Sequence, residues 1–112
     1  MSEPFKVGDI LYTSWGYEQT NIDFFRVVKV TPQTVVIEGI PSTVDHSVTG
    51  SDYMIPRSDA APIQSALLDK PQQRFKLSLP AGKTPYIRLA DYAYAWRWDG
   101  TPKRQTAAGY GH

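Results

Sequence analysis

Cysteine is absent from this chain, which excludes disulfide bonds, thiolate zinc sites and thiol nucleophiles. Only two histidines are present, His46 and the final residue His112, so groups that exchange protons near neutral pH are scarce. Two histidines without cysteine make a poor zinc site, and no P-loop or dinucleotide fingerprint occurs. We therefore expect no metal, no cofactor and no catalytic residues, and an enzyme ranks third among the hypotheses below.

Long apolar runs are also missing. No stretch of about 18 consecutive apolar residues occurs, and the N-terminal MSEPFKVGDI has neither the basic start nor the apolar run of a secretory signal. We therefore expect a cytoplasmic protein without membrane contact. A hydrophobic content of 41% and a charged content of 21% are typical of globular proteins, and the length suits a single domain over residues 1–112.

Short segments rich in β-branched and aromatic residues predict a mainly β protein. The predicted strands are 10–15, 23–30, 35–40, 73–79, 86–89 and 92–98, with a turn at Thr31-Pro32-Gln33-Thr34. The Gly8-Asp9-x-Leu11-Tyr12 opening and the meander after it resemble an SH3-like barrel. We expect five to seven short antiparallel strands in a small SH3-like barrel or sandwich.

The pattern weakens between residues 41 and 80, where the prolines at 41, 56, 62 and 71 interrupt any long element. Ile63, Ala66 and Leu67 stand at i, i+3 and i+4, a spacing that allows one short helix near 63–68.

The most informative segment spans residues 91–104. Four large aromatic residues recur there at every second position before Asp99-Gly100: Tyr92, Tyr94, Trp96 and Trp98. This pattern predicts a β-hairpin in which residues 103–107 pair back on 92–98. Because side chains alternate across a strand, the four rings would share one face and Ala93, Ala95 and Arg97 the other.

Three interpretations of this aromatic stripe remain open. The favoured one is core, because a small β protein needs large side chains in its interior. The second is a platform on which bases stack while neighbouring arginines hold phosphates. The third is a protein-binding face, because Trp, Tyr and Arg carry much of the energy of interfaces.

The net charge of +1 conceals an asymmetry along the chain. Residues 1–56 hold three basic and seven acidic side chains, whereas residues 57–112 hold nine basic and four acidic ones. An evenly mixed exterior is the simpler interpretation. The alternative is a basic face around the hairpin, built from Arg88, Arg97, Lys103 and Arg104, that meets a phosphate backbone or an acidic protein.

Two stretches resemble small uncharacterised proteins carried by phages and other mobile elements: GDILYTSWGYEQTNIDFFRVVKV at residues 8–30 and YAYAWRWDGTPKRQTAAGYGH at residues 92–112. The resemblance implies a host-cell cytoplasmic setting and an accessory role, such as binding nucleic acid or blocking a host or defence protein. It brings no site residues with it.

Two functional hypotheses follow. The first is a non-catalytic module that binds nucleic acid through a basic aromatic hairpin, with the site residues Arg88, Trp96, Arg97, Trp98, Lys103 and Arg104. The second is a protein-binding inhibitor or adaptor directed at a host protein, with Trp15 and Tyr17 as exposed anchors beside the tryptophans of the stripe. A homo-oligomer stays open, because exposed apolar patches tend to find a partner.

Overall fold

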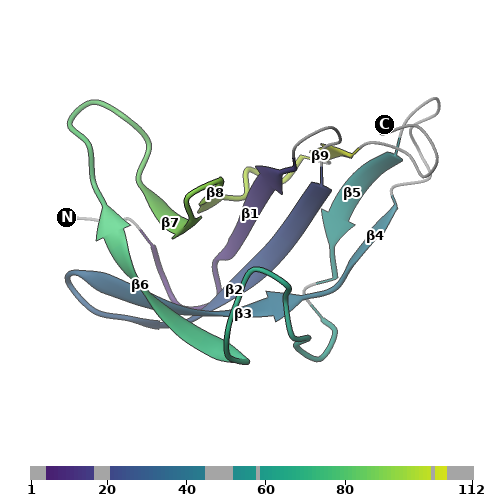
Figure 1. Cartoon of the computed structure of the whole chain (residues 1–112), viewed down its shortest axis with the longest axis horizontal. Helices are drawn as coiled ribbons and strands as arrows, with labels where there is room; N and C mark the ends of the chain where they lie inside the picture. The colour runs from purple at the N-terminus through teal and green to yellow at the C-terminus, as the bar shows by residue number, and fades with distance from the viewer. Residues whose placement is uncertain (1–4, 17–20, 45–51, 58, 102, 106–112) are drawn as a thin grey trace.

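Six antiparallel strands close into a barrel in the computed structural model, which describes residues 5–16, 21–44, 52–57, 59–101 and 103–105. The strands follow one another around the barrel in the order β1-β2-β3-β6-β7-β8, and β8 pairs back on β1 (Figure 1). Their bounds are β1 Ile10–Trp15, β2 Asn21–Val30, β3 Thr34–Ile40, β6 Gln72–Ser78, β7 Tyr86–Ala90 and β8 Ala93–Arg97. The predicted fold class, a small SH3-like barrel of short antiparallel strands, is confirmed.

A second, smaller sheet lies beside the barrel. It consists of β4 (Ser42–Val44), β5 (Asp52–Pro56) and β9 (Lys103–Gln105), in the order β4-β5-β9 (Figure 1). The predicted pairing of residues 103–107 with 92–98 is therefore wrong for residues 103–105, and residues 106 and 107 lie outside the described part of the chain. Both edges of β8 are already occupied, by β7 on one side and β1 on the other, so β9 pairs with β5 instead. Gly100 has the positive φ of 89° that an Asp-Gly turn favours, but this turn leads out of the barrel.

The barrel interior is filled by the inward-facing side chains of its strands. The fully buried members include Leu11, Phe25, Val27, Val35, Ile37, Ile87, Ala93 and Ala95. Phe5, which precedes the first strand, is 0% exposed and belongs to the same cluster. The guanidinium carbon of Arg97 lies 5.8 Å from the centre of the Phe5 ring. A residue outside the sheet thus completes the core.

The segment 63–68 packs against β3, and it is not helical. The Ile63 N–H donates to the Gly39 carbonyl at 2.8 Å, which forms an isolated antiparallel bridge. The Gln64 amide donates to the carbonyls of Ser65, Leu68 and Lys70, groups that a continuing helix would bond internally. The short helix expected near 63–68 does not form, because these polar groups find partners in β3 and in the loop. Leu67 and Leu68 are buried in the core.

Gly39 makes this close approach possible. A Cβ at position 39 would stand 2.8 Å from the Ile63 carbonyl oxygen and 3.0 Å from the Ser65 Cβ. We expect Gly39→Ala to lower the free energy of unfolding by about 1 to 3 kcal/mol, because the contact is with backbone and one of the two segments has to move. Urea unfolding measures this change. If the variant were as stable as the parent, the segment 63–68 would not be held against β3.

A second apolar cluster lies between the barrel and the small sheet. Ile22, Phe24 and Ile40 point outward from β2 and β3 and contact Met54 of β5. Ile10, Tyr12 and Trp98 pack partly buried against this cluster. The small sheet therefore covers one side of the barrel. It does not cover the outer surface of β7 and β8.

Candidate nucleic-acid interface

Four aromatic side chains form a continuous surface outside the barrel, on β1, β7 and β8. Tyr86, Trp96 and Tyr12 stand directly opposite one another across the three strands. Ring centroids lie 5.9 Å apart for Tyr12 and Trp96, 6.4 Å for Trp96 and Tyr94, and 5.5 Å for Tyr94 and Tyr86. We call these four residues the aromatic face. Their tilted and edge-to-face arrangements are those that aromatic pairs prefer.

The interpretation of the aromatic stripe as core is wrong, as the burial of the individual side chains along β8 shows. Ala93 and Ala95 are fully buried, whereas Tyr94 on the opposite side of the strand is 37% exposed. The larger interior side chains of the other strands, together with Phe5, fill the barrel, so β8 contributes only methyl groups to it. Trp98 is the member of the stripe that does join a core, since its ring packs edge-to-face on Phe24 at 6.1 Å in the second cluster.

Tyr92 and Trp15 form a separate pair. Tyr92 lies in the turn before β8, is 63% exposed, and its ring centroid is 5.8 Å from that of Trp15. The Trp15 indole N–H donates to the Asp23 carboxylate at 2.5 Å, and the ring packs partly buried against the barrel core. Trp15 is thus a half-buried side chain rather than a free anchor. Tyr17, predicted beside it, lies outside the described residues.

The predicted cations do not share one face. Arg88 stands opposite Tyr94 at the border of the aromatic face and forms an ion pair with Asp91. Arg97 follows Ala93 and Ala95 on the inward side of β8, where it approaches Asp9 to 3.4 Å and covers Phe5. Arg104 is in register with Tyr53, and its side chain is outside the described part of the structure.

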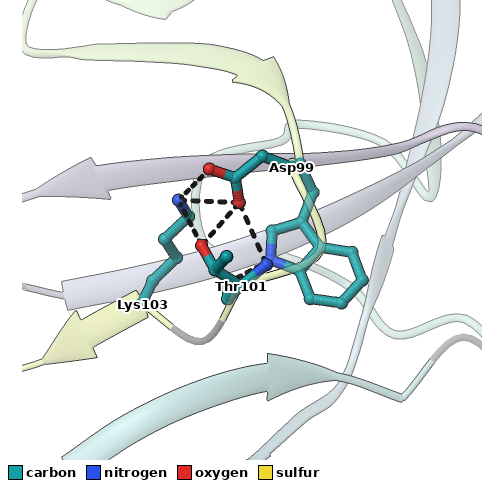
Figure 2. Close-up of polar contacts among 4 residues, drawn as sticks. Asp99, Thr101 and Lys103 are labelled. Atoms are coloured by element: carbon teal, nitrogen blue, oxygen red, sulfur yellow. Dashed lines mark hydrogen bonds and ion pairs between the residues drawn. The ribbon is translucent and has the colours of Figure 1, made fainter.

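Lys103 is held by the turn that precedes β9 (Figure 2). Its ammonium donates to Asp99 at 3.1 Å and to the Thr101 hydroxyl at 3.2 Å, and it lies 4.5 Å from the centre of the Tyr12 ring. The Trp98 indole N–H donates to the Thr101 carbonyl at 2.7 Å. One turn thereby fixes both a cation beside the aromatic face and an aromatic ring of the second cluster.

The pKa of Asp99 is lowered well below its ordinary value of 3.8. The main causes are hydrogen bonds from the Thr101 hydroxyl at 2.7 Å and the Thr101 backbone N–H at 3.0 Å, followed by the bond from Lys103. All three favour the ionised carboxylate.

We expect a carboxyl NMR titration to find the pKa of Asp99 below that of an ordinary aspartate, and Thr101→Val to raise it by removing the hydroxyl donor. Because the folded-state pKa is depressed, the stabilisation by Asp99 is present above its ordinary pKa of 3.8 and is lost as the pH falls through the folded value. Stability relative to Asp99→Asn should therefore decline below about pH 4. An unchanged pKa in Thr101→Val would contradict the assignment.

Tyr12 and Tyr86 complete the aromatic face, and sequence reasoning did not assign them to the site. The signal was present: Tyr86 alternates with the inward Ile87, and Tyr12 with the inward Leu11. Alternation within one strand shows two faces, but only the pairing of β1 and β7 with β8 brings these tyrosines beside Trp96. The contact of Lys103 with Tyr12 depends on the same tertiary arrangement.

No protein-family model, curated protein or solved structure matches this chain. Within the described residues, no helix is long and apolar enough to cross a membrane. The same residues contain no group of three or more histidine, aspartate or glutamate side chains placed to hold a metal ion.

Proposed function

We propose that this chain is a non-catalytic module that binds single-stranded nucleic acid by stacking bases on the aromatic face. The observation that supports this most directly is the row Tyr86, Trp96 and Tyr12, which lies on the outer surface of the sheet with Tyr94 beside it. Aromatic rings on the outer surface of a small β-barrel are the usual platform for unpaired bases.

Single strands fit this surface better than duplexes. The rings are fixed to one another across neighbouring strands, so they form a rigid platform that needs little ordering on binding. Stacking needs an exposed base plane, which a duplex hides and a single strand offers at every nucleotide. The guanidinium of Arg88 at the border of the face adds a planar group on which a base can stack.

The test is fluorescence anisotropy with a labelled oligothymidylate of about 15 nucleotides, comparing the parent with Tyr94→Ala and Trp96→Ala. Loss of a stacking ring is expected to weaken binding by about 1 to 3 kcal/mol, roughly 5- to 150-fold. Tyr92→Ala is the matched control, because that exposed ring contacts Trp15 and lies outside the aromatic face.

Equal affinities of the parent and both face variants, each shown to be folded, would rule out the stacking proposal. So would a Tyr92→Ala variant that loses as much affinity as Trp96→Ala, because the effect would then not be specific to the face.

A protein-binding inhibitor or adaptor is the second candidate. The observation that favours it is that Arg88, Arg97 and Lys103 each have a carboxylate partner, which reduces their attraction for phosphate. Tyrosine and tryptophan beside arginine also form the energetic centres of protein interfaces. The resemblance to proteins of phages and mobile elements is compatible with both candidates and implies an accessory role in a host cell. Absence of oligonucleotide binding at about 20 mM salt would favour this candidate, because phosphate contacts are strongest at low salt.

A further inference from the structure

A second outer surface of the barrel carries cations that the aromatic face does not include. Lys29 of β2, Val36 of β3 and Arg74 of β6 stand directly opposite one another across three strands. Lys76 lies two residues beyond Arg74, opposite Thr34. The residues next to them pack in or against the core, so these side chains point outward. Those neighbours are Val30 of β2, Val35 of β3, and Phe75 and Leu77 of β6.

Lys29, Arg74 and Lys76 are exposed, and within the described residues none of them forms an ion pair. The carboxylate in the neighbouring row, Glu38, is only 8% exposed and is bound by Arg26 at 2.9 Å. Its charge is therefore already neutralised. This contrasts with Arg88 and Lys103 beside the aromatic face, which each have an acidic partner.

A hollow of about 530 Å³ adjoins Arg74 on this surface. Its lining includes the cations Lys70 and Arg74, the apolar Val36 and the acidic Asp69. The Asp69 backbone N–H is bonded to the Gln73 side chain at 2.7 Å, which fixes this rim of the hollow. The four cations Lys29, Lys70, Arg74 and Lys76 are called the basic face below. These four cations outnumber Asp69, the one carboxylate that lines the hollow, so this surface carries a net positive charge.

The basic face adjoins the aromatic face through the pairing of β6 with β7. Ser78 stands opposite Tyr86, and Lys76 is the next outward position on β6. Lys76 therefore lies on the same outer side of the sheet as Tyr86, diagonal to it and one residue beyond the last paired position of β6. A single strand of nucleic acid whose base stacks on Tyr86 has its phosphates within reach of Lys76.

We propose that the basic face binds the phosphate backbone of the nucleic acid whose bases stack on the aromatic face. This inference rests on the proposed function for its occupant, and it assigns the phosphates to a surface different from the one that the sequence indicated. Spaced lysine and arginine side chains bind a polyanion through the release of its counterions, without reading its sequence.

The test is a salt series of anisotropy titrations with two probes of equal length, the oligothymidylate and an abasic deoxyribose-phosphate strand. Each phosphate contact adds about 0.7 to the steepness of log K against log salt on a single strand. We expect the double variant Arg74→Ala/Lys76→Ala to reduce the slope by roughly 1.4 on both probes. Lys6→Ala/Arg57→Ala is the matched control, because it removes the same charge at exposed positions outside both faces.

The abasic probe separates this inference from the proposed function, because it offers phosphates but no bases. Parent binding to the abasic strand that is lost in Arg74→Ala/Lys76→Ala supports the basic face. Equal slopes in that double variant and in the control overturn it, as does an abasic strand that does not bind at about 20 mM salt while the oligothymidylate does. If the abasic strand binds as tightly as the oligothymidylate, the stacking proposal fails and the basic face stands.

Discussion

Replacing Arg26 with methionine is expected to lower the free energy of unfolding by about 3 kcal/mol. The Arg26 guanidinium donates to the Glu38 carboxylate at 2.9 Å and to the Ala60 carbonyl at 3.2 Å, and Gln72 donates to the other Glu38 oxygen at 3.2 Å. Glu38 is nearly buried, so loss of its cation leaves an uncompensated charge in a poorly solvated position. Arg26 is itself partly exposed, which places the expected effect at the lower end of the range for buried pairs.

The double variant Arg26→Met/Glu38→Leu tests this reason directly. With both charges removed, the site holds two apolar side chains of similar size, and the stability is expected to return to within about 1 kcal/mol of the parent. Urea unfolding of the parent, the two single variants and the double variant forms a thermodynamic cycle. A double variant as unstable as Arg26→Met would show that the contact with Ala60, rather than the ion pair, carries the effect.

Replacing Phe5 with alanine is expected to cost about 3 to 5 kcal/mol, as much as the loss of a phenylalanine from the middle of a strand. Phe5 is fully buried although it lies outside the sheet, and it belongs to the main core cluster beneath the Arg97 side chain. Its removal leaves a cavity at the barrel interior and also removes the apolar surface on which Arg97 packs.

Two controls make the Phe5 measurement specific. Phe5→Leu keeps most of the buried volume and is expected to cost less than about 1.5 kcal/mol. Val7→Ala changes a residue of the same segment that is 67% exposed, and it is expected to alter stability by no more than about 0.5 kcal/mol. Equal stability of Phe5→Ala and Val7→Ala in urea would show that the segment before β1 does not complete the core.

The strands of the barrel could be predicted because their sequences alternate locally, but the aromatic stripe shows where such reasoning stops. Alternation separated Tyr94 and Trp96 from Ala93 and Ala95 correctly, yet it does not say which set faces inward. That choice depends on how much of the interior the remaining strands and Phe5 fill. Size favoured the aromatic residues as core, whereas the space left inside the barrel accepts only alanine from β8.

Pairing between strands that are distant in the sequence explains the other differences between the predicted and the observed structure. The Asp99-Gly100 turn was identified correctly, but the partner of the strand after it depends on β1, which occupies the edge that a simple hairpin would need. The ion pair of Arg97 with Asp9 likewise joins residues from opposite ends of the chain. Such a contact has no local signal, so Arg97 could not be separated from the cations around the aromatic face.

The alternation along β6 was visible from the sequence, but its functional meaning was not. Arg74 and Lys76 are the expected polar side of a half-buried strand. Their place beside Lys29 follows from the pairing of β3 with both β2 and β6. A basic surface assembled from three strands has no continuous charge run to reveal it.

Closure of the barrel also determines how this protein can associate with other chains. Each of its six strands has a neighbour on both sides, so among the described residues no barrel strand offers a whole free edge to template a further strand. In the same part of the chain, the strands with a whole free edge are β4 and β9, each described over three residues. Short edges of this kind are poor seeds for fibril growth or for capture of an extended peptide. The architecture therefore favours recognition through side chains, on surfaces that can change in sequence without opening the sheet.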